Sequence, residues 1–182
     1  MTSGFSFYNV KNILNMFKHL LITTLSLFSI AAAIQAQTLE TFETETDDAI
    51  SFSEGGVNFG LTGNFHIENF AGQGVNNSNF FIDNSNNCPN TGTIGSITSS
   101  ELITLNSIFI FTSSDCTTQD GGQVTLTALR QGVIVGRVNV TTFSAGGNNG
   151  FYLFNNLFND TPFDELQFGV NGSLRYIAID DF

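Results

Sequence analysis

The sequence contains no tryptophan, and basic residues are almost as scarce, with five lysines and arginines among 182 residues. Both lysines, Lys11 and Lys18, lie in the first 36 residues. Three arginines and all sixteen acidic residues follow, so the net charge of that part is 3 − 16 = −13. Nucleic acids and anionic membranes are bound through lysine and arginine, so this charge excludes both classes of partner. The acidity fits a soluble exported protein in a cation-rich setting.

Catalytic motifs are missing as well. The chain has no Gly-x-Ser-x-Gly elbow, no phosphate loop and no histidine-rich metal set. The one histidine after residue 36, His66, alternates with apolar residues as a strand residue does. Carboxylate pairs can cleave glycosidic bonds, and Asp164-Glu165 or Glu68 with Asp83 are nominal candidates. The sequence therefore predicts a protein that is not an enzyme, with a small glycoside-active enzyme as an alternative.

The first 36 residues have the organisation of a secretory signal peptide. Met16–His19 is basic, 20–34 is an apolar run, and small residues precede an expected cleavage after Ala36. The apolar run is too short to favour a membrane span. We expect 1–36 to be a cleaved signal peptide with an upstream extension and Met16 as the true start. Residues 37–182 then form one exported domain, secreted or at the cell surface.

The two cysteines, Cys88 and Cys116, both lie in loop-like sequence. Two loop cysteines of an exported chain most often form a disulfide, which would stabilise the fold by about 2–4 kcal/mol. A metal site is a poorer alternative, because two thiolates need further soft ligands.

Residues 37–182 show no helical periodicity; short apolar runs are separated by Gly, Asn, Ser and Asp. The expected strands are 39–44, 49–53, 57–61, 64–69, 79–83, 101–112, 123–130, 133–142, 151–154, 163–170 and 173–181.

Many short strands without helices predict an all-β sandwich of two antiparallel sheets. Alternation places Val124, Leu126 and Ala128 of one strand on the inner face, and Leu166, Phe168 and Val170 of another. Asn171-Gly172 separates two strand patterns by two residues, which favours a tight hairpin. Without tryptophan, the 16 phenylalanines after residue 36 must supply much of the core.

The order of several short motifs resembles bacterial extracellular jelly-roll modules, namely carbohydrate-binding modules, MAM-like sandwiches and related domains of surface-sorted proteins. The resemblance spans about residues 38–182 and rests on five segments. These are Phe42-Glu43, 105–110, 123–135, 163–168 and the closing 176–181. It implies a jelly-roll sandwich. The tryptophan platforms of the binding modules and the cysteine that MAM domains carry near Phe-Glu are both missing here.

The resemblance also implies a structural calcium ion, held by Glu43 and Asp180. Calcium takes six to eight oxygen ligands, and Asp47, Asp48 and Glu54 lie close enough in sequence to complete the shell. Asp181 should point to the opposite face of its strand and be solvated.

These observations predict a non-catalytic binding or adhesion module, with a glycan or a surface protein as partner. A purely structural or interaction domain of a larger surface protein is the alternative. The modules that it resembles continue past this closing motif, so the chain is expected to be truncated after Phe182.

Overall fold

A computed structural model describes residues 41–85, 92–116, 118–142 and 148–182. In these ranges the chain forms strands, turns and one short 3₁₀ turn, η2 (Val75–Asn77). The strands are β1 (Ser51–Glu54), β2 (Val57–Gly63), β3 (His66–Asn69), β4 (Phe80–Asp83), β5 (Gly92–Ile103), β6 (Ser107–Ser113), β7 (Gly122–Arg130), β8 (Val133–Thr142), β9 (Tyr152–Asn155), β10 (Phe163–Val170) and β11 (Tyr176–Asp180).

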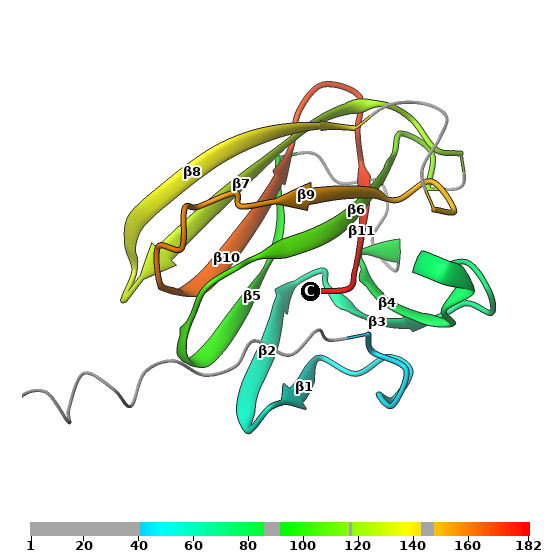
Figure 1. The fold of residues 1–182 in the computed structure, drawn as a ribbon. Helices are drawn as coiled ribbons and strands as arrows, with labels where there is room; N and C mark the ends of the chain where they lie inside the picture. The colour runs from blue at the N-terminus through cyan, green and yellow to red at the C-terminus, as the bar shows by residue number, and fades with distance from the viewer. Residues whose placement is uncertain (1–40, 86–91, 117, 143–147) are drawn as a thin grey trace, which may run out of the picture. The chain divides into compact units, whose positions relative to one another are not determined.

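The strands form two sheets, and all paired neighbours are antiparallel (Figure 1). The six-stranded sheet has the order β1-β2-β5-β10-β7-β8, and the five-stranded sheet has the order β3-β4-β11-β6-β9. For the described residues, this confirms the predicted all-β class with two antiparallel sheets.

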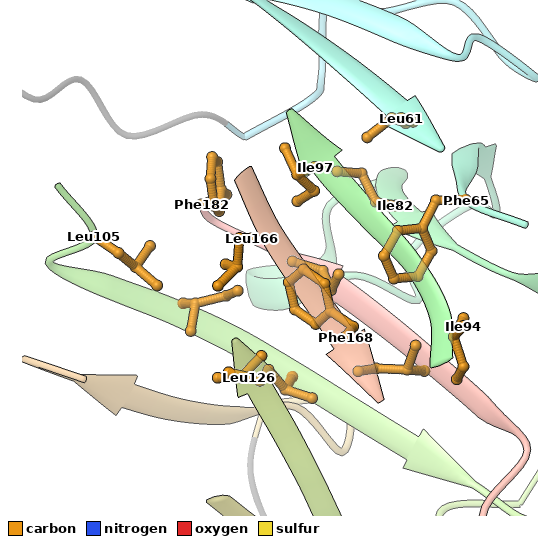
Figure 2. Packing of buried hydrophobic residues seen from close by; sticks show 14 of the residues in the cluster. Leu61, Phe65, Ile82, Ile94, Ile97, Leu105, Leu126, Leu166, Phe168 and Phe182 are labelled. Carbon is orange, nitrogen blue, oxygen red and sulfur yellow. The ribbon is translucent and has the colours of Figure 1, made fainter. Parts of the chain in front are cut away.

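One apolar core joins the inner faces of the two sheets. Leu126 and Phe168 of the six-stranded sheet and Ile82 of the five-stranded sheet belong to the same buried cluster (Figure 2). The two predicted inner faces, on β7 and β10, are both buried. Phenylalanine fills much of this core, as expected without tryptophan, and Phe65 packs edge-on against Phe168.

The expected strand at 39–44 is wrong where the structure describes it. Residues 42–45 form a turn, in which the Glu45 N–H donates to the Phe42 carbonyl at 3.0 Å. Phe42 has a φ of 59°, which no strand residue adopts, and this turn directs its ring into the core.

Two further predictions are also wrong. The segment 101–112 is two strands, because β5 ends at Ile103 and β6 begins at Ser107. The first part of β5 is rich in Thr, Ser and Gly, so its sequence gives little apolar signal. Asn171-Gly172 does not close a hairpin, since β10 and β11 lie in different sheets. β10 already has β5 and β7 on its two edges, so the chain crosses to the other sheet instead.

Some predictions fall on residues that the structure does not describe. Cys88 lies in 86–91 and the expected signal peptide lies in 1–40, so the Cys88–Cys116 pairing and the leader stay predictions. In the described part of the chain, no helix has the length and apolarity that crossing a bilayer requires.

Candidate functional site

The outer face of the five-stranded sheet carries a second, smaller apolar layer. Strand alternation turns Phe81 of β4 and Tyr176 and Ala178 of β11 away from the main core. These residues pack with Val75 of η2 and with Phe151, which immediately precedes β9. β11 is therefore buried on both faces, although it lies in an antiparallel sheet.

A pocket of about 530 Å³ lies over this outer face. Its lining combines aromatic rings with amide and carboxylate groups. The lining residues are Glu68, Phe70, Gln73, Phe81, Asp83, Ser85, Phe111, Cys116, Gln119, Asn149, Phe151, Tyr176 and Ala178. They come from β3, β4, β6 and β11 and from four loops, so only the folded sheet assembles them.

The loop 70–79, between β3 and β4, is tied down at two points. Asn149 Nδ2 donates to the carbonyl oxygens of Gly72 at 3.0 Å and Gly74 at 2.8 Å. On the other side, Asp180 Oδ2 accepts the Val75 N–H at 2.7 Å and the Ser78 hydroxyl at 2.8 Å. These bonds hold the wall of the pocket against the sheet.

Gly74 lets this loop approach the carboxylate so closely. A Cβ at residue 74 would lie 2.6 Å from Asp180 Oδ2 and would also overlap the Ser78 hydroxyl. Asp180 itself is fully buried. Burial raises the pKa of Asp180 to about 7, even though the hydrogen bonds from Val75 and Ser78 favour the ionised form.

Three ionisable side chains converge at one edge of the pocket. His66 and Glu68 are two residues apart on β3 and share its outer face, and Asp83 of β4 is directly opposite His66 in the register. His66 Nε2 lies 3.2 Å from Glu68 Oε2 and 3.3 Å from Asp83 Oδ1. The ligand atoms of all three lie within 4.8 Å of one another. We call these three residues the acidic triad.

Neighbouring groups fix both carboxylates of the acidic triad. Tyr176 Oη donates to Asp83 Oδ2 at 2.7 Å, and the Ser85 N–H donates to Asp83 Oδ1 at 3.1 Å. The Ser85 hydroxyl donates to Glu68 Oε2 at 3.2 Å. Burial raises the pKa of Asp83, opposed by the hydrogen bond from Tyr176. Burial, together with the charge of Asp83, raises the pKa of Tyr176 well above its ordinary value.

The two principal residues of the expected calcium site, Glu43 and Asp180, both accept hydrogen bonds from the segment 75–80. Asp180 accepts the Val75 N–H and the Ser78 hydroxyl, and Glu43 Oε1 accepts the backbone N–H groups of Asn79 at 2.7 Å and Phe80 at 3.2 Å. Neither belongs to a converging group of three metal-ligating side chains among the described residues. The calcium site stays a prediction.

The other candidate ligands are spread over different contacts. Asp47 Oδ1 accepts the Asn69 N–H at 2.9 Å, Asp48 lies in the same turn with a φ of 64°, and Glu54 ends β1. Asp181 was expected to be solvated, but it is only 9% exposed. Burial raises the pKa of Asp181, and the charge of Glu43 raises it further. The two carboxylates, Asp181 and Glu43, thus interact electrostatically.

Sequence reasoning missed the pocket and the acidic triad. It listed Glu68 with Asp83 only as a nominal pair and described His66 as an ordinary strand residue. The available signal was the His-x-Glu spacing, which places both side chains on one face of a strand. The pairing of β3 with β4, which adds Asp83, carries no such local signal.

Comparison with known proteins gives little further guidance. No protein-family model matches the sequence, and no curated protein matches it either. Among solved structures, the chain is similar to a DUF4465 family protein from Bacteroides caccae ATCC 43185. The two share 12% sequence identity with a TM-score of 0.46, over 83% of this chain and 94% of that chain.

Proposed function

We propose that the protein is a non-catalytic binding module of an exported bacterial protein, secreted or displayed at the cell surface, which holds an extracellular glycan. The observation that carries this proposal is the pocket on the outer face of the five-stranded sheet. Its volume of about 530 Å³ falls within the range of about 300–1,000 Å³ that small-molecule sites occupy.

The chemistry of the lining supports a glycan ligand. A sugar ring has apolar C–H faces and a rim of hydroxyl groups. The pocket offers phenyl rings, such as Phe111 and Phe151, beside the polar groups of Gln119, Asn149 and Glu68. Rings can pack against the C–H faces while amides and carboxylates bind the hydroxyls. This arrangement would replace the tryptophan platform that the sequence lacks.

The strand order supports a jelly roll as the finer description of the fold. From β4 to β11, consecutive strands change sheets except at the β7–β8 hairpin and yield the orders β4-β11-β6-β9 and β5-β10-β7-β8. Two four-stranded sheets connected in this way form a jelly roll. In this description, β1 and β2 extend one sheet and β3 extends the other.

A glycan array with the full chain, with and without calcium, tests the proposal. Phe111→Ala removes a ring from the pocket lining. Phe109 lies on the same face of β6 but does not line the pocket, so Phe109→Ala is the control. We expect binding to fall at least about tenfold in the first variant and to persist in the second. Absence of any glycan binding would instead favour a purely structural or interaction domain.

A small glycoside-active enzyme is the second candidate, favoured by the presence of both Glu68 and Asp83 in the pocket lining. Retaining glycosidases hold two carboxyl groups about 5 Å apart. Hydrolysis of polysaccharide substrates that is lost in Glu68→Gln would support this function over simple binding. Asp164 and Glu165 lie on β10, in the other sheet, and do not line the pocket.

A further inference from the structure

We propose that the acidic triad, His66, Glu68 and Asp83, is a binding site for a divalent first-row transition metal such as zinc. The inference does not depend on a glycan in the pocket. It rests on the donor set, the spacing of the donor atoms and the groups that orient them.

The two donor distances from His66 fit tetrahedral coordination. Zinc binds imidazole nitrogen and carboxylate oxygen at about 2.0–2.1 Å, so two ligands of a tetrahedral ion lie about 3.3–3.4 Å apart. His66 Nε2 lies 3.2 Å from Glu68 Oε2 and 3.3 Å from Asp83 Oδ1. An octahedral magnesium ion at about 2.1 Å would draw adjacent ligands to about 3.0 Å. The imidazole also selects against magnesium and calcium, which prefer oxygen ligands.

The surrounding groups orient the donors as they do in metal sites. A metal bound at Nε2 requires the proton of the His66 ring on Nδ1, which lies 3.5 Å from the Asn64 carbonyl oxygen that would accept it. Tyr176 and the Ser85 N–H bind Asp83, while the Ser85 hydroxyl binds Glu68. Ligating carboxylates are commonly held by such outer hydrogen bonds.

One coordination position would remain open toward the pocket. Three protein ligands leave the fourth position of a tetrahedral ion for water or another ligand. Glu68, Asp83 and Ser85 all line the pocket, so a molecule in the pocket could reach the ion. The site is therefore of the open type, in contrast to a closed structural zinc site with four protein ligands.

The test is a titration of the metal-free full chain with zinc, magnesium and calcium by isothermal calorimetry, without any glycan. We expect one zinc ion per chain at this site and no magnesium or calcium binding that depends on His66. His66→Gln and Glu68→Gln should each weaken zinc binding at least tenfold. Glu101→Gln, at an exposed position of β5 outside the triad, should leave it within about twofold.

The absence of zinc binding by the unaltered chain, or unchanged zinc affinity in the triad variants, would overturn the proposal. Circular dichroism checks that each variant folds. If His66→Gln does not fold, the partly exposed Glu68→Gln decides the matter. Cobalt substitution adds a spectroscopic control, because a thiolate-to-cobalt charge-transfer band would assign the ion to the cysteines instead and contradict the triad.

Discussion

The stability of the metal-free protein should fall as the pH rises from about 4 to 7, because of Asp180. Its pKa is about 7 in the folded chain, against an ordinary value of 3.8. Between these values, the folded state keeps a proton that the unfolded state has released, so the free energy of unfolding decreases with pH. The shift of 7 − 3.8 = 3.2 corresponds to about 4 kcal/mol in total, at about 1.36 kcal/mol per unit.

The full loss of unfolding free energy is reached only above the pKa of Asp180 in the folded state, and no loss occurs below its pKa in the unfolded state. Integrating the linkage relation between pH 4.5 and 8 gives about 3 kcal/mol. Burial is the main cause, and the neighbouring charge of Asp181 acts in the same direction. Asp83 and Asp181 also have raised pKa values, so they add to the slope and must be separated from it by mutation.

Urea unfolding at several pH values, followed by far-ultraviolet circular dichroism with EDTA present, measures this slope; the chain has no tryptophan to report by fluorescence. Asp180→Asn keeps the shape of the side chain but cannot ionise. The variant should therefore lose about 3 kcal/mol less of its free energy of unfolding between pH 4.5 and 8 than the original chain does. Ser78→Ala removes a hydrogen bond that favours the ionised carboxylate, so it should move the loss to higher pH. Identical slopes in the original chain and Asp180→Asn would refute the reasoning.

Three further predictions concern the calcium site, the triad and the packing of the sheets. If the expected calcium ion binds, adding calcium after EDTA, to a concentration of a hundred times the dissociation constant, should raise the melting temperature by about 5–10 °C. Glu43→Gln and Asp180→Ala should each abolish this rise. A melting temperature that does not respond to calcium would contradict the site. Tyr176→Phe should destabilise the fold by about 1–2 kcal/mol at neutral pH in urea unfolding, because it removes the hydroxyl that binds the buried Asp83; an unchanged midpoint would mean that this hydrogen bond contributes nothing. Gly95→Ala should destabilise the fold by at least about 2 kcal/mol, because the added Cβ would meet the backbone of β2 and a Phe65 ring atom at 2.9 Å. Gly169→Ala is the control, since the nearest atom to its added Cβ lies at 3.5 Å. It should change stability by less than half as much.

Alternation along single strands was enough to predict the fold class and two inner faces. Val124, Leu126 and Ala128 repeat every second residue, and a period of two in an antiparallel sheet reports burial on one face. The same reasoning failed at Asn171-Gly172, because local turn chemistry does not show whether the next strand joins the same sheet or the opposite one. That choice depends on which sheet edges are already paired.

The candidate sites show a similar limit. The resemblance implied Glu43 and Asp180 as calcium ligands, but it did not show that Asp180 accepts hydrogen bonds from Val75 and Ser78 in the loop 70–79. A contact between residues about a hundred positions apart leaves no pattern in either segment. The acidic triad was missed for the same reason, since Asp83 joins His66 only through strand pairing.

The breakdown of alternation is itself informative about function. β11 reads Tyr-Ile-Ala-Ile-Asp, and every residue is buried, including those that face away from the main core. An antiparallel sandwich normally leaves such positions to solvent, so a continuous apolar strand requires a covering layer on the outer face. Here, that layer comprises η2, Phe151 and the loop that Asp180 holds, and the pocket lies within it. Two of the residues that violate the sandwich pattern, Tyr176 and Ala178, therefore line the proposed site.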